Sequence, residues 1–174
     1  MRKLQSNLKV IGLIGYSGSG KTHFILKAIE DLRNKLNLNA AVIKYIHEHQ
    51  IDKEGKDTYE YSQAGAKFAI TKNDFNETVI FLKNKIEIEE VIKWISISPF
   101  KVDLIFIEGF RNLNYPTILC VKNFKEIESQ LTSHVKMISG LICKENIRNS
   151  DNLDLPIVNI EKEFGKFLEI FDLK

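Results

Sequence analysis

The segment GYSGSGKT, residues 15 to 22, has a composition and spacing that suit phosphate binding. It matches the pattern G-x-x-x-x-G-K-[ST], in which glycines allow positive φ angles and a close approach of the backbone to a ligand. Successive amide N–H groups can then point at one anion. Lys21 would neutralise the outer phosphates of a nucleotide, and the Thr22 hydroxyl is a suitable ligand for Mg²⁺. The segment therefore predicts a phosphate-binding loop that works with a divalent cation.

The residues around this loop predict a strand before it and a helix after it. Leu8 to Ile14 is almost entirely apolar, and apolar residues recur on one helix face from Phe24 to Leu36. The helix would add its unpaired N-terminal amides and its dipole to the attraction for an anion. This context is the one that the phosphate-loop pattern requires.

A second acidic site is expected at the carboxyl end of a neighbouring strand, where open α/β sheets bind ligands. The segment VDLIFIEGF offers Asp103 and Glu108, which an extended strand would separate by about 16 Å. We assign Glu108 to the water shell of the metal or to the attacking water, and Asp103 to the start of the strand. Arg111 follows on the same loop, where it could contact a phosphate or remain solvent-exposed.

The polar stretch from Lys44 to Ala66 is predicted to leave the sheet at the same edge. Asp57 is the acid expected to approach Mg²⁺ directly, and Lys56 beside it could contact phosphate or substrate. His47 and His49 would suit a transition metal if the chain is extended there, but without a third ligand they fit solvent-exposed histidines better.

The identity of the base stays open at this stage. TKND, which ends at Asp74, satisfies the short pattern [NT]-K-x-D by which many GTPases recognise guanine. The pattern occurs often by chance, and here it precedes the Glu108 strand instead of following it.

Alternating strands and helices predict an α/β fold of the P-loop NTPase type, with a mainly parallel twisted sheet and helices on both faces. A small antiparallel excursion is expected near residues 67–83, and Phe164, Phe167 and Phe171 predict a closing helix that packs on the sheet. No linker or repeat marks a boundary, so we expect a single nucleotide-binding domain over residues 1–174. The other predicted strands are Ala40 to Ile46, Val102 to Ile107, Thr117 to Val121 and Met137 to Ile142.

Composition narrows the classes of partner. The chain has 25 Lys and Arg against 23 Asp and Glu, which gives no basic surface for nucleic acid. Its apolar stretches are much shorter than the roughly 20 residues that cross a membrane, so we expect a cytoplasmic protein. Cys120 and Cys143 stand alone in apolar segments and are expected to be buried thiols.

Three segments together resemble the MobB family, the GTP-binding accessory proteins of molybdopterin-guanine dinucleotide biosynthesis. GYSGSGKT is similar to the family's phosphate loop, and DKEGKDTYEYSQAGA, residues 52–66, is similar to its D-K-x-G-K-D-[ST]-Y...AGA segment. DLIFIEGFR, residues 103–111, is similar to its D-hhhh-EGF-[KR] segment. One departure is Tyr45, which stands where the family commonly has histidine.

The resemblance implies a homodimer that binds GTP with Mg²⁺, hydrolyses it slowly and assists the guanylyltransferase that attaches GMP to molybdopterin. Molybdopterin or its guanine dinucleotide is a further candidate ligand. The catalytic residues are expected to be Lys21 and Glu108, and the metal ligands Thr22, Asp57 and Glu108. The nucleotide-binding residues are expected to be Gly15, Ser17, Gly18, Ser19, Gly20, Lys21, Thr22, His23, Lys56 and Arg111.

Two other functions use the same loop. A small-molecule kinase would need positive groups that close over the transferred phosphoryl group, and the four arginines of the chain, Arg2, Arg33, Arg111 and Arg148, are scattered. Lysines could replace them, so the kinase remains the alternative. An ATP-driven dimer of the ParA kind would carry a second lysine early in the loop, where this chain has Tyr16.

Overall fold

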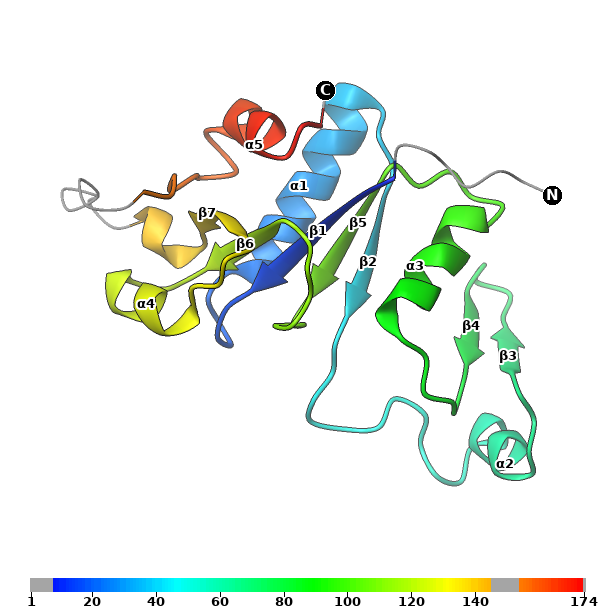
Figure 1. Ribbon diagram of the computed structural model, residues 1–174. Coiled ribbons are helices and arrows are strands. Elements are labelled where there is room, and N and C mark those ends of the chain that lie inside the picture. The colour runs from blue at the N-terminus through cyan, green and yellow to red at the C-terminus, as the bar shows by residue number, and fades with distance from the viewer. Residues whose placement is uncertain (1–7, 145–153, 174) are drawn as a thin grey trace. The chain divides into compact units, whose positions relative to one another are not determined.

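The computed structural model describes residues 8–144 and 154–173 (Figure 1). Its internal contacts divide the chain into two compact units. One unit comprises Met1–Tyr45 together with Ile92–Lys174, and the other comprises Ile46–Val91. The expectation of a single domain stays a prediction.

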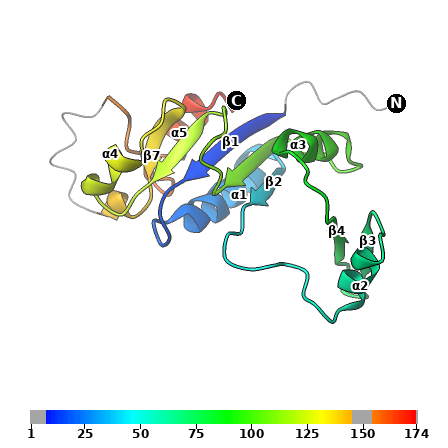
Figure 2. The same ribbon diagram turned by 60° about the horizontal axis from the view of Figure 1, so that its bottom comes forward.

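The first unit is built on a five-stranded parallel sheet with the order β2-β5-β1-β6-β7. The arrowheads of β1, β2 and β5 point the same way in Figures 1 and 2, and the registers of all four strand pairs are parallel. The loop that follows β1 therefore emerges at the carboxyl edge, near the middle of the sheet. The strands are β1 (Lys9–Ile14), β2 (Ala40–Lys44), β5 (Leu104–Glu108), β6 (Thr117–Cys120) and β7 (Val135–Ser139).

Helices cover both faces of this sheet. On one face, α1 (Lys21–Leu36) and α5 (Phe164–Ile170) share an apolar core with the strands, and the rings of Phe24 and Phe167 meet edge to face at 5.5 Å. On the other face, the short α4 (Ile127–Gln130) follows the 3-10 turn η1 (Phe124–Glu126) and packs with η2 (Leu141–Lys144) against β1, β6 and β7. The predicted α/β architecture is confirmed.

The second unit contains α2 (Asp57–Gln63) and a two-stranded antiparallel sheet of β3 (Ala69–Lys72) and β4 (Thr78–Phe81). This hairpin confirms the predicted excursion near residues 67–83. TKND forms the end of β3 and the start of its turn, where the Asn73 side chain accepts hydrogen bonds from the amides of Phe75 and Glu77. Helix α3 (Ile88–Ile97) crosses the boundary between the units.

One predicted strand is displaced. Residues 137–142 were expected to be extended, but β7 ends at Ser139 and residues 141–144 form η2. Gly140 turns the chain with a φ of 98°, and the amide of Leu141 then donates to the carbonyl of Ser19 at 3.1 Å instead of extending the strand. A continuous apolar run does not distinguish these two conformations.

Over the part of the chain that the structure describes, every helix is too short or too polar to cross a membrane.

Candidate functional site

The loop between β1 and α1 has the backbone that its glycines predict. Gly15, Gly18 and Gly20 all have positive φ angles, of 144°, 71° and 100°. A β-carbon on Gly15 would lie 2.1 Å from the carbonyl oxygen of Cys120, so no larger residue fits there. Gly20 is the N-cap of α1, and the first amides of the helix therefore follow directly on the loop. This arrangement is suited to an anion.

Lys21 lies back over the loop. Its ammonium donates to the carbonyl oxygens of Gly15 and Tyr16, both at 2.9 Å. An ammonium has three hydrogens to donate, so these two bonds leave one for a ligand. The charge is thus held above the nest of amides that the loop provides.

Glu108 and the phosphate loop line one hollow of about 320 Å³. Glu108 ends β5 as expected, is 7% exposed, and lies 3.6 Å from the ammonium of Lys44 at the end of β2. Asp103 precedes the same strand at its other end, where its carboxylate accepts from the amide of Asn39. The remaining residues of the hollow are Ser17, Gly18, Gly20, Lys21, Thr22 and His23.

The oxygen atoms of this hollow fit Mg²⁺. Thr22 is exposed and contributes a hydroxyl, and Glu108 contributes a carboxylate. Mg²⁺ is commonly held by one or two protein oxygens together with phosphate oxygens and water. In the described ranges, no group of three or more His, Cys, Asp or Glu side chains is arranged to hold a metal ion by itself.

The structure also gives the positions of the other predicted residues near the loop. The guanidinium of Arg111 donates to the Gln130 side chain at 3.0 Å and lies 5.5 Å from the centre of the Tyr16 ring. It is therefore held beside the phosphate loop by α4. Ser19 is fully buried, and its amide donates to the Tyr16 carbonyl, so it shapes the loop from within. His23 belongs to the exposed side of the first turn of α1.

Lys56 and Asp57 belong to the second unit, where they line a separate hollow of about 400 Å³. Lys56 is the N-cap of α2 and Asp57 is its first residue. In the same hollow, Asp52 accepts a hydrogen bond from the Thr58 hydroxyl at 2.8 Å. The expected contacts of Lys56 with phosphate and of Asp57 with Mg²⁺ stay predictions. His47 and His49 are exposed in this unit, as is Asp74.

Two lysines near the loop were missed from the sequence. Lys44 ends β2 in the hollow, and the Lys122 ammonium lies 3.6 Å from the point where a β-carbon on Gly18 would stand. Each comes at or just after the carboxyl end of a strand, which is the position where open α/β sheets bind ligands. That rule could have found both.

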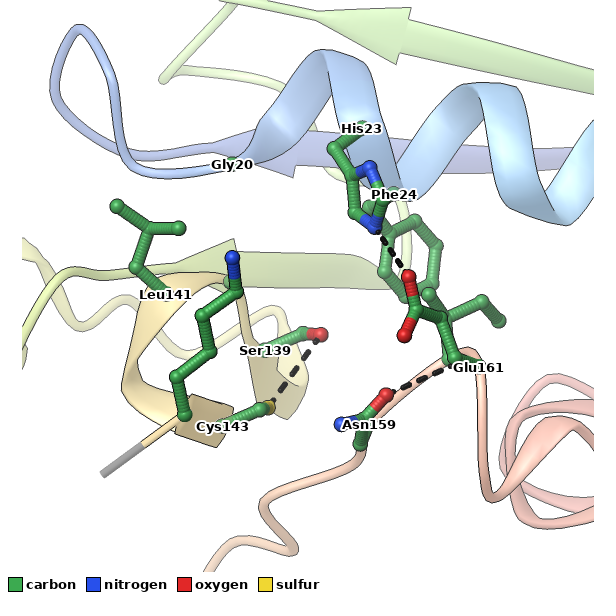
Figure 3. Close-up of a pocket in the computed structure, with 11 residues that line it drawn as sticks. Gly20, His23, Phe24, Ser139, Leu141, Cys143, Asn159 and Glu161 are labelled. Carbon is green, nitrogen blue, oxygen red and sulfur yellow. Dashed lines mark hydrogen bonds and ion pairs between the residues drawn. The ribbon is translucent and has the colours of Figure 1, made fainter.

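A further pocket, of about 260 Å³, adjoins the hollow at the phosphate loop (Figure 3). We call it the His23–Glu161 pocket. Its lining comes from the start of α1, from residues 139–144 and from residues 159–161, and it shares Gly20 and His23 with the phosphate hollow. Cys143 is half-buried in it, and burial raises the pKa of this thiol above its usual value. Burial raises the pKa of Cys120 to about 12, so both cysteines are neutral at physiological pH.

Comparison with known proteins agrees with this geometry. The family model described as molybdopterin guanine dinucleotide synthesis protein B matches residues 10–144. A putative molybdopterin-guanine dinucleotide biosynthesis adapter protein from Methanocaldococcus jannaschii is 34% identical over 136 residues, which are 75% of this chain and 54% of that protein. An adapter protein of the same name from Haemophilus influenzae is 31% identical over 118 residues, or 67% of this chain and 65% of that protein.

Solved structures share the fold. The crystal structure of Bacillus subtilis MobB has a TM-score of 0.72 at 21% identity, over 94% of this chain and 98% of that one. A MobB homologue from Bacillus stearothermophilus has a TM-score of 0.68 at 15% identity, over 95% and 99% of the two chains. The chain spans between about half and two thirds of the length of the curated relatives it matches. With its phosphate loop, its buried Glu108 and this family match, the chain belongs to the MobB family of molybdopterin guanine dinucleotide synthesis proteins.

Proposed function

We propose that this protein binds GTP with Mg²⁺ at its phosphate loop, hydrolyses it slowly, and assists the guanylyltransferase step of molybdopterin-guanine dinucleotide synthesis. The observation that carries the proposal is that one hollow is lined by Gly18, Gly20, Lys21, Thr22 and Glu108. It combines the loop amides and the Lys21 ammonium, which can hold phosphates, with a hydroxyl and a carboxylate, which can hold a metal ion and its water.

In this proposal each side chain has one task. The loop amides and the Lys21 ammonium hold the phosphates and compensate the charge that develops during transfer. The Thr22 hydroxyl would hold Mg²⁺, which would neutralise charge on the phosphate oxygens. Glu108 is kept in place by Lys44 and positions water near the terminal phosphate. A carboxylate with one cationic neighbour keeps lone pairs available for that water.

The accessory role is supported by the names of the relatives, which are adapter proteins of molybdopterin-guanine dinucleotide biosynthesis. In the proposal, two copies of the chain associate, and the main output is the efficiency of the guanylyltransferase. Slow hydrolysis fits this role, because an adapter does not need rapid turnover.

Calorimetric titration of the protein with GTP and with ATP, both in the presence of Mg²⁺, shows which nucleotide it prefers. A clear preference for GTP supports the accessory role and justifies adding the guanylyltransferase. Preference for ATP would instead favour a small-molecule kinase, whose further requirement is a phosphoryl acceptor. If neither nucleotide binds, the proposal that the phosphate loop binds GTP is wrong.

Replacing Glu108 by glutamine is expected to leave GTP affinity within about threefold and to lower the rate of hydrolysis at least about tenfold. A carboxamide has nearly the same shape but is neutral, and it holds water and metal more weakly. The measurement is phosphate release under single-turnover conditions at saturating GTP and Mg²⁺.

Asp103→Asn is the matched control, because it makes the same chemical change at the opposite end of β5. Its carboxamide oxygen can still accept the bond from the amide of Asn39. Hydrolysis by this variant should equal that of the wild type. Unchanged hydrolysis in Glu108→Gln would exclude Glu108 from the mechanism.

A further inference from the structure

We propose that the His23–Glu161 pocket binds the base of the nucleotide and that Glu161 selects guanine. The inference rests on the proposed binding of a nucleotide at the phosphate loop and deepens it by assigning the residue that recognises the base.

The pocket is joined to the phosphate loop by fixed contacts. The amide of Leu141 donates to the carbonyl of Ser19 at 3.1 Å, and a β-carbon on Gly20 would be only 3.2 Å from the α-carbon of Gly140. The segment after β7 is therefore held directly against the loop. A ligand whose phosphates occupy the loop has its next group at the mouth of this pocket.

The size and lining of the pocket fit one flat part of a larger ligand. Its volume of about 260 Å³ lies just below the roughly 300–1,000 Å³ of complete ligand pockets. Phe24, Leu141 and Ile160 contribute apolar surface, which suits the faces of a purine ring. His23, Asn159 and Glu161 provide polar groups that can contact the edge of the ring (Figure 3). The other polar side chains of the lining are Ser139, Cys143 and Lys144.

The backbone that carries Glu161 is firmly shaped. The Asn159 side chain accepts from the amide of Glu161 at 3.0 Å, and the amide of Asn159 itself donates to the Glu163 carboxylate at 3.0 Å. The carbonyl of Asn159 accepts from the amides of Lys162 and Glu163. This turn follows Val158, which is hydrogen-bonded to β7 through the carbonyl of Ile138. Glu161 is thus placed by the sheet.

The Glu161 carboxylate points across the pocket to His23, and its Oε1 lies 2.9 Å from His23 Nε2 (Figure 3). The two side chains are 53% and 65% exposed, so a ligand can reach them. A carboxylate has about four acceptor positions, and the histidine uses one. The imidazole therefore orients the carboxylate and leaves acceptor positions for a ligand.

A carboxylate distinguishes the two purines by the direction of their hydrogen bonds. Guanine presents two neighbouring donors, the N1–H and the 2-amino group, and an ionised carboxylate can accept from both. Adenine presents an acceptor at its N1 and has no 2-amino group. A site that accepts hydrogen bonds at this edge therefore favours guanine, because adenine leaves the carboxylate desolvated and unpaired.

The test compares Glu161→Gln with the wild type in calorimetric titrations with GTP, ATP and inorganic tripolyphosphate, all with Mg²⁺. We expect the wild type to prefer GTP and the variant to bind GTP at least about tenfold more weakly. Its affinity for tripolyphosphate should stay within about twofold, because that ligand has no base to contact Glu161. Its affinity for ATP should stay the same or rise, because adenine would no longer desolvate a charged group.

Xanthosine triphosphate provides a second test, in which the Glu161→Gln variant should gain affinity. Xanthine has a carbonyl at position 2 in place of the amino group, and a carboxamide can donate to it where a carboxylate cannot. Glu161→Gln should therefore bind xanthosine triphosphate more tightly than the wild type does. A variant that merely disturbs the fold would not gain affinity for a new base.

Glu128→Gln, on the exposed side of α4, is the matched control and should leave every affinity unchanged. Equal binding of GTP and ATP by the wild type would overturn the inference while nucleotide binding stands. An equal loss of affinity for GTP, ATP and tripolyphosphate in Glu161→Gln would also overturn it. If the wild type binds neither nucleotide, the proposed function fails, and the assignment of the base pocket fails with it.

Discussion

Replacement of Lys21 by alanine should lower the affinity for GTP by about 100-fold or more. Hydrogen bonds to charged groups contribute about 1.5–3 kcal/mol each, and removing the ammonium leaves phosphate charge uncompensated in the hollow. About 3 kcal/mol corresponds to roughly 150-fold in affinity. ATP and tripolyphosphate should lose affinity to a similar extent, because Lys21 contacts only the phosphates in this proposal. Calorimetric titration with Mg²⁺ measures all three.

The same substitution also removes two hydrogen bonds, from the ammonium to Gly15 and Tyr16. Thermal unfolding of the variant should therefore be measured first, to show that it is folded at the titration temperature. Lys136→Ala, at an exposed lysine near the start of β7, is the matched control for loss of a positive charge. Affinity within about threefold of the wild type in Lys21→Ala would contradict phosphate binding at this loop.

The parts of the site that sequence predicted are those whose residues are close together in the chain. GYSGSGKT contains its own glycines, lysine and hydroxyl, and the apolar run before Glu108 fixes that residue to the end of a strand. Both conclusions need only local patterns and the rule that ligands meet the carboxyl edge of a parallel sheet. The phosphate loop and Glu108 accordingly line one hollow in the structure.

The His23–Glu161 pocket could not be predicted in this way, because its three segments are far apart in sequence. Residues 159–161 carry no motif, and Glu161 is one of 23 acidic residues until the sheet brings it opposite His23. TKND shows the limit of a short pattern. It matches a pattern that occurs often by chance, and in the structure it forms the end of β3 and the start of the hairpin turn, where the Asn73 side chain accepts hydrogen bonds from two backbone amides.

Gly140→Ala should be among the most destabilising single-methyl changes in this chain. Gly140 has a φ of 98°, and a β-carbon there would lie 2.3 Å from the carbonyl oxygen of Ser19 and 2.9 Å from that of Val121. Backbone strain of about 1–3 kcal/mol adds to an overpacking cost of about 1–3 kcal/mol. At roughly 2–4 °C for each kcal/mol, the melting temperature should fall by about 10 °C.

Gly165→Ala separates this effect from the general consequences of replacing glycine. Gly165 lies in α5, and nothing stands within 4 Å of the β-carbon that alanine would add. This control should be neutral or stabilise by up to about 1 kcal/mol, because alanine favours helices. If Gly140→Ala has the same melting temperature as the wild type, the segment after β7 can shift to accommodate the added methyl group. It then does not hold the pocket rigidly against the loop. If Gly140→Ala is strongly destabilised while Gly165→Ala is not, the contact between Gly140 and Ser19 is rigid, and the segment after β7 is held firmly against the loop.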